Sequence, residues 1–143
     1  MRIRPAIVAL TAVLATAASA EPWTKIDELP GGIGVEIDEN SQVEALDGVN
    51  LVERATFRRE LPNGTMETAV AVDCGHGLAK IRGVRLVNGD DVLAQNVDDN
   101  AKYAPVHQGS SEAIYYKALC GTEPPPPADT PPADTPPAEA QDQ

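Results

Sequence analysis

The stretch Met66–Cys74, METAVAVDC, decides the fold. Its side chains alternate as they do along a β-strand. One face is formed by Met66, Thr68, Val70, Val72 and Cys74. The only other cysteine, Cys120, ends a segment with a helical pattern, residues 110–120. The sequence therefore predicts a sheet that carries a helix near its C-terminal end.

Turn signals around this strand predict an antiparallel meander. Asp47–Gly48, Pro62–Thr65 and Asn88–Asp90 each separate two segments of alternating pattern. Strands joined by such short turns run antiparallel, and no long crossover is present that could join parallel strands. The expected fold class is α+β, with a small antiparallel sheet of five to six strands and one C-terminal helix.

The longest predicted strand is Leu51–Leu61. Its odd-numbered positions are expected to form the core face: Leu51, Ala55, Phe57 and Leu61. Its even-numbered positions are expected to face water: Arg54, Thr56, Arg58 and Glu60.

The helix is predicted over Ser110–Cys120. Ser110 or Ser111 can cap its free amides, and Glu112 lies in the first turn, where the helix dipole favours an acid. Gly121 is expected to end the helix in a left-handed conformation.

The two ends of the chain differ from the middle. Residues 1–20 have two basic residues, an apolar run and an Ala18-Ser19-Ala20 cleavage site, which is typical of a secretory signal peptide. Residues 122–143 are rich in proline and acids and are expected to form an extended, disordered tail. Residues 21–121 then form one domain, and the protein is expected to be exported, periplasmic or secreted, with no lipidation cysteine near the cleavage site.

The chain of 143 residues has a net charge of −11. Removal of residues 1–20 takes away two bases and no acid, which leaves nine basic and 22 acidic residues and a net charge of −13. A chain with this charge does not attract nucleic acid or an anionic membrane. We expect no membrane insertion after signal cleavage.

Two cysteines in an exported chain are typical of a disulfide. A metal site and a nucleophilic thiol are the alternatives. Cys74-Gly75-His76 is too cramped for tetrahedral zinc and has no second local pair of ligands.

Basic residues are concentrated in two neighbouring strands: Arg54, Arg58, Arg59, Lys80, Arg82 and Arg85. A partner-binding basic patch could be formed by Arg54, Arg58, Lys80 and Arg82. The alternative is cross-strand pairing with acids on the wet face, namely Glu44, Glu53, Glu60 and Glu67.

No group of residues indicates a catalytic reaction. His76 and His107 are the only histidines, and neither is accompanied by a recognisable nucleophile turn. The paired aspartates at 90–91 and 98–99 lack the spacing of a calcium loop. We therefore expect no enzyme, no cofactor and no metal.

The order of several motifs resembles the surface-adhesin family named after protein E. The matching residues, spread over residues 23–120, are Trp23, Ile37-Asp38, Ser41, Val72-Asp73-Cys74, Gly109-Ser110 and Cys120. The resemblance implies a small antiparallel sheet with a C-terminal helix tied to it by a Cys74–Cys120 disulfide. It also implies binding of host matrix or serum proteins, and the ability to form a homodimer.

The expected function is a non-enzymatic protein-interaction module that binds a protein partner in the envelope or outside the cell. An envelope structural protein, whose proline-rich tail spans or contacts the cell wall, is the alternative.

Overall fold

The structure, a computed structural model, describes residues 22–127. The predicted signal peptide and the tail from residue 128 onward lie outside the described residues. Within residues 22–127, no helix has the length and apolarity that a membrane span requires.

Eight strands form one antiparallel sheet, rather than the predicted five to six. The strands are β1 Trp23–Leu29, β2 Ile33–Asp38, β3 Val43–Asp47, β4 Asn50–Leu61, β5 Gly64–Asp73, β6 Leu78–Asn88, β7 Asp91–Val97 and β8 Ala104–Pro105. The order across the sheet is β1-β2-β4-β5-β6-β7, and β3 and β8 add to β4 and β6.

The larger strand count has a structural reason. The long strand β4 pairs with β2 through its C-terminal half and with β3 through its N-terminal half. A short 3₁₀ turn, η1 (Glu39–Ser41), separates β2 from β3. The hydroxyl of Ser41 accepts a hydrogen bond from the Thr56 amide at 2.8 Å, which joins this turn to the middle of β4.

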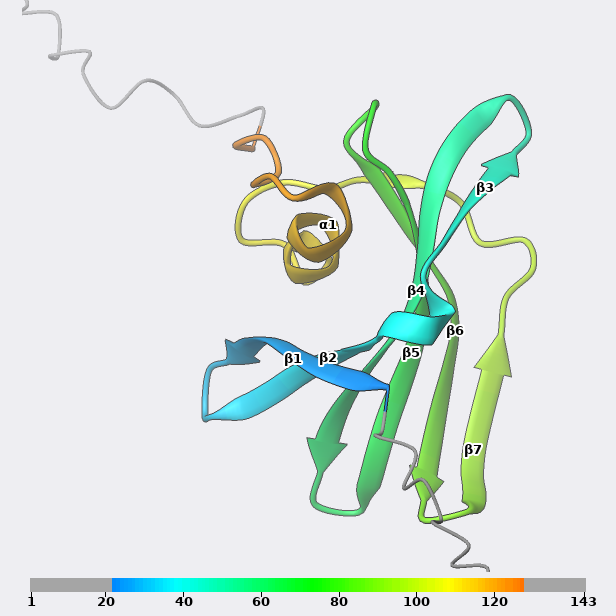
Figure 1. Cartoon of the computed structure of the whole chain (residues 1–143), viewed down its shortest axis with the longest axis vertical. Helices are drawn as coiled ribbons and strands as arrows, with labels where there is room; N and C mark the ends of the chain where they lie inside the picture. Colours follow the sequence, from blue (N-terminus) through cyan, green and yellow to red (C-terminus); the bar gives the residue numbers. More distant parts are fainter. Residues whose placement is uncertain (1–21, 128–143) are drawn as a thin grey trace, which may run out of the picture.

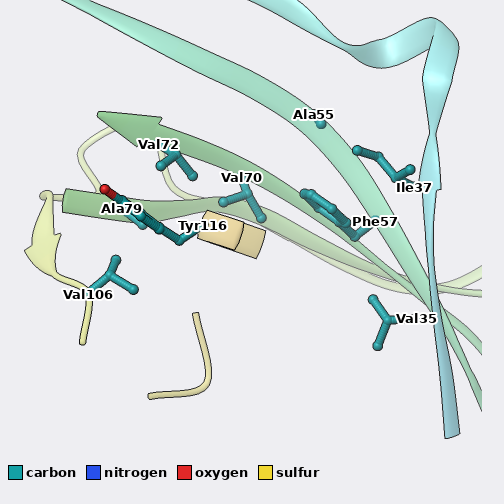
Figure 2. Packing of buried hydrophobic residues seen from close by; sticks show 9 residues of the cluster. All are labelled: Val35, Ile37, Ala55, Phe57, Val70, Val72, Ala79, Val106 and Tyr116. Atoms are coloured by element: carbon teal, nitrogen blue, oxygen red, sulfur yellow. The ribbon is translucent and has the colours of Figure 1, made fainter. Parts of the chain in front are cut away.

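One face of the sheet, which we call the helix-side face, packs against the helix α1 (Ala113–Cys120) (Figure 1). The core lies between them (Figure 2) and contains Val35, Ile37, Ala55, Phe57, Val70, Val72, Ala79, Val106 and Tyr116. The rings of Phe57 and Tyr115 have their centroids 4.6 Å apart. The predicted core positions Ala55 and Phe57 are confirmed.

The predicted core position Leu51 is wrong. Leu51 is 54% exposed, whereas its neighbour Val52 is 1% exposed. Strand alternation puts Val52 on the opposite face, which we call the outer face. This end of the outer face is covered, since Lys80 and Tyr103 meet there on Asp47.

The helix is shorter than expected, because residues 110–112 form turns before it. The predicted serine cap is wrong: no side chain caps the helix, and the Ser110 hydroxyl oxygen is enclosed without a hydrogen-bond partner. The prediction for Gly121 is confirmed. Its φ is 70°, and its amide donates to the Lys117 carbonyl at 2.9 Å.

The disulfide between Cys74 and Cys120 is confirmed, with a Cα–Cα distance of 5.6 Å. It joins the end of β5 to the last residue of α1. The proline-rich segment begins by packing on the domain: Pro124 is buried, and the Pro125 carbonyl accepts from the Gln108 amide at 2.9 Å. Residues 122–125 thus lie against the domain, although the prediction began the tail at residue 122.

Candidate functional site

Three of the four predicted patch residues lie on the outer face. The register pairs Arg54 with Ala71 and Ala71 with Lys80, so the two cations flank one buried alanine. Arg58 follows on the same face by strand alternation. Arg82 is the extra residue of a β-bulge in β6, where that alternation is interrupted. It forms no ion pair within residues 22–127.

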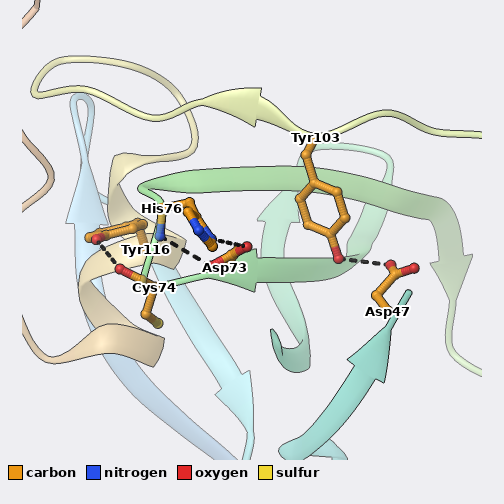
Figure 3. A network of polar contacts seen from close by, with 6 residues as sticks. All are labelled: Asp47, Asp73, Cys74, His76, Tyr103 and Tyr116. Atoms are coloured by element: carbon orange, nitrogen blue, oxygen red, sulfur yellow. Dashed lines mark hydrogen bonds and ion pairs between the residues drawn. The ribbon is translucent and has the colours of Figure 1, made fainter. Parts of the chain in front are cut away.

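Asp47, the last residue of β3, binds two of these cations. Its Oδ2 accepts from Tyr103 Oη at 2.8 Å (Figure 3). The same oxygen accepts from Lys80 Nζ at 2.6 Å, and Arg54 Nη2 lies 3.9 Å away. The hydrogen bonds from Lys80 and then Tyr103 lower the pKa of Asp47. Burial, followed by the bond to Asp47, raises the pKa of Tyr103 to about 12. Both cations are thus already in contact with the one carboxylate of Asp47, Lys80 through a hydrogen bond and Arg54 at a longer distance.

The remaining cations of the outer face are also paired. Arg58 Nε donates to Glu36 Oε2 at 2.5 Å, and its guanidinium lies 4.5 Å from the centroid of a Trp23 ring. Arg85 forms an ion pair with Glu67. Of the four glutamates expected to pair with these bases, only Glu67 has an ion pair among the described residues.

A cleft of about 480 Å³ lies between the β3–β4 hairpin and the loop that follows β5. Both segments project at the same end of the molecule (Figure 1). We call this concavity the acidic cleft. It is lined by Glu44, Val49, Asn50, Leu51, Glu53, Asp73, Cys74, Gly75 and His76.

The acidic cleft contains two carboxylates without a partner. The hairpin register places Glu44 directly opposite Glu53, and like charges in this arrangement repel. Neither forms an ion pair or a side-chain hydrogen bond within residues 22–127. A positively charged group bound between them would relieve the repulsion.

Apolar side chains lie on the same hairpin as these carboxylates, and Val49 and Leu51 line the cleft with them. Leu46, Val49 and Leu51 are 71%, 95% and 54% exposed. Large apolar residues this exposed, gathered on one hairpin, are typical of a surface that another molecule covers. The cleft can therefore accept a ligand that is both basic and apolar.

The acidic cleft also contains an aspartate–histidine pair that the sequence did not predict. Asp73 is buried, and its two carboxylate oxygens accept from the His76 amide at 3.1 Å and from His76 Nδ1 at 2.8 Å (Figure 3). An ionised carboxylate only accepts, so Nδ1 carries a proton and Nε2 is left for another partner. The side chain of His76 is 63% exposed.

The side chains that accompany the pair in the cleft are few in kind. The residues that line the cleft include no serine, no threonine and no free cysteine. Within the described part of the chain, no group of three or more His, Cys, Asp or Glu residues could hold a metal ion. The pair holds the loop after β5 in place, since both hydrogen bonds join His76 of that loop to Asp73, the last residue of β5.

The disulfide fixes the position of this end of the site. Cys74 lines the cleft and is bonded to Cys120, and the Tyr116 hydroxyl donates to the Cys74 carbonyl at 3.2 Å (Figure 3). The wall of the cleft is thus attached to the C-terminal turn of α1 by a covalent bond and a hydrogen bond.

Comparison of this chain with models of protein families, with curated proteins and with solved structures found no match. The resemblance to the protein E family, and the host-protein binding and dimerisation that it implies, stay predictions.

Proposed function

We propose that this chain is an exported, non-enzymatic protein-interaction module that binds a basic, apolar segment of a protein partner in the acidic cleft. The observation that supports it best is the pair of unpartnered carboxylates, Glu44 and Glu53, beside exposed aliphatic side chains in the largest concavity described. A lysine or arginine of the partner would lie between the carboxylates, and its aliphatic neighbours would cover Val49 and Leu51.

The predicted basic patch supports an acidic partner less well. Arg54 and Lys80 already contact Asp47, and Arg58 already contacts Glu36. An acidic partner would have to replace these carboxylates, at a cost in desolvation and lost hydrogen bonds. A basic partner could bind Glu44 and Glu53 without replacing an existing ion pair.

The experiment is a selection of random twelve-residue peptides on the chain from Glu21 to Gln143. We expect the selected peptides to be enriched in lysine or arginine next to aliphatic residues, and to shift the amide resonances of residues 44–53 and 73–76. The double variant Glu44→Gln/Glu53→Gln should weaken their binding at least tenfold.

The matched control is Asp98→Asn/Asp99→Asn, which removes two carboxylates from a turn away from the cleft. It should leave the affinity within about twofold, because exposed charges at a distance are screened by salt. Equal weakening by both double variants would reduce the effect to the overall charge of the chain. Selected peptides without basic residues would contradict the proposal directly.

A further inference from the structure

A second concavity lies on the helix-side face, at the other end of α1. It has a volume of about 240 Å³, and we call it the Arg59 pocket. Aliphatic side chains from four elements form its walls: Leu29, Val35, Ile81, Val84 and Ile114. The polar groups in its lining are Arg59, Thr68, Ser111, Glu112 and Tyr115, and Met66 completes it.

Arg59 is a half-buried cation without an acidic partner. Its Nε is enclosed and has no hydrogen-bond partner. Its Nη2 lies 3.9 Å from the thioether sulfur of Met66, which is a weak acceptor. Glu112 also lines the pocket but forms no ion pair with it.

The contrast with the outer face lies in the carboxylates alone, since the Nε of Arg54 is also enclosed without a hydrogen-bond partner. There, Arg54, Arg58 and Arg85 each have a carboxylate within ion-pair distance. A cation removed from water normally needs a counter-charge, because burial without one costs several kcal/mol. Arg59 has no such counter-charge among the described residues, and it lines a cavity.

The phenol of Tyr115 adds a neutral hydrogen-bonding group to the same cavity. Burial raises the pKa of Tyr115, whereas the positive charge of Arg59 and a hydrogen bond with Thr68 lower it. Tyr115 and Arg59 line the same pocket, so the neutral phenol is a second polar group available there.

From this geometry we infer that the Arg59 pocket binds a carboxylate carried on a short aliphatic group. The planar guanidinium can donate two parallel hydrogen bonds to a carboxylate. The donors left for a ligand are those of its terminal nitrogens, because Nε is enclosed by the protein. The aliphatic walls would cover the rest of the ligand. A phosphate or sulfate fits less well, because the apolar walls cannot satisfy the additional oxygens.

The volume limits the size of the ligand. Pockets for drug-sized molecules have about 300–1,000 Å³, so about 240 Å³ suits a chain of a few carbons. Two sources have this chemistry: a free short-chain fatty acid, and the C-terminal carboxylate of a polypeptide that ends in an aliphatic residue.

The experiment measures binding of hexanoate to the chain from Glu21 to Gln143 by calorimetry and by NMR. Hexanamide, which has the same shape without the charge, should bind at least tenfold more weakly. Hexanoate should shift the side-chain Nε–H resonance of Arg59, and Arg59→Gln should lower its affinity at least tenfold. A peptide that ends in valine, compared with the same peptide amidated, distinguishes the second source from the first.

Arg82→Gln is the matched control, because Arg82 is also an arginine without an ion pair but does not line the pocket. It should leave hexanoate binding unchanged, as should Glu44→Gln/Glu53→Gln, so this test is independent of the acidic cleft. Glu112→Gln should increase the affinity about two- to threefold, because it removes a competing charge. Equal affinity for hexanoate and hexanamide, or an Arg59 resonance that does not move, would overturn the inference even if Arg59→Gln failed to fold.

Discussion

The two ends of α1 carry opposite chemistry. At its C-terminal end, the acidic cleft has two carboxylates without partners in an open concavity of about 480 Å³. At its N-terminal end, the Arg59 pocket has one cation without a partner in about 240 Å³. The first residues of α1 line the Arg59 pocket, whereas the acidic cleft is linked to α1 through the disulfide and the hydrogen bond from Tyr116.

Among residues 22–127, the outer face has lysine and arginine ion pairs that the acidic cleft and the Arg59 pocket do not have. Its cations are paired with Asp47, Glu36 and Glu67, so it has little to offer a charged ligand. The difference indicates that the residue types alone do not mark a binding site in this chain, since arginines and glutamates occur in all three places. The informative feature is a charge that the fold leaves unpaired beside an apolar cavity.

Removal of the disulfide should give the largest change in stability. It should also affect the acidic cleft more than the Arg59 pocket. For a sequence separation of 46, Cys74→Ser/Cys120→Ser should lower the free energy of unfolding by about 3–4 kcal/mol. Urea denaturation with and without the disulfide measures it. Because Cys74 lines the acidic cleft, the amide shifts should be larger there than around the Arg59 pocket.

If the double variant showed amide shifts of the same size at the acidic cleft and at the Arg59 pocket, the disulfide would stabilise the sheet as a whole. A loss below about 1 kcal/mol would show that α1 stays in place through packing alone. Single cysteine variants are unsuitable as controls, because each leaves a reactive thiol. Reduction of the native chain is the better comparison.

Gly64→Ala should act at the opposite end of β5 from the disulfide. Gly64 begins β5 close to Met66 of the Arg59 pocket and has a φ of 142°. A Cβ atom there would lie 2.4 Å from the Val87 carbonyl oxygen. We expect a loss of about 2–3 kcal/mol from the strained backbone and the clash, measured by urea denaturation, and weaker hexanoate binding.

Gly75→Ala is the control within the acidic cleft. Its φ is not in the left-handed region, and the nearest atom to an added Cβ is a carboxylate oxygen of Asp73 at 3.5 Å, an ordinary contact. The free energy of unfolding should change by less than about 0.5 kcal/mol. If both variants lost equal stability, the close approach of Gly64 to β6 would not be the cause.

Much of the fold could be predicted because it depends on local signals. The alternation of β5, the left-handed glycine after α1 and the two cysteines predicted the helix, its end and the disulfide. At Leu51 and Val52 the alternation holds but the buried side was predicted wrongly, because Tyr103, far away in the sequence, joins Asp47 and Lys80 on the outer face at this end of the sheet. No local pattern contains that contact.

The two candidate sites differ in how far they could be predicted. The Asp47–Gly48 turn signal implies a short hairpin, and a two-residue loop sets the register that places Glu44 opposite Glu53. The facing pair of glutamates could therefore have been found in the sequence, whereas the second wall of the cleft, residues 73–76, could not. The Arg59 pocket could not have been found in the sequence. It depends on where α1 packs on the sheet and on which arginines form ion pairs.

Tyr103→Phe tests the outer face, where we expect the smallest effect. The loss of one hydrogen bond to Asp47 should cost about 1 kcal/mol at pH 7. The pKa of Tyr103 in the fold, about 12, lies above the ordinary value of 10.0. The stabilisation by the neutral phenol is therefore complete below pH 10 and is lost as the pH rises towards and through 12. Urea denaturation at pH 7, 10 and 11 should show the stability of the native chain falling towards that of the variant, and parallel curves would mean that Tyr103 does not titrate in this window.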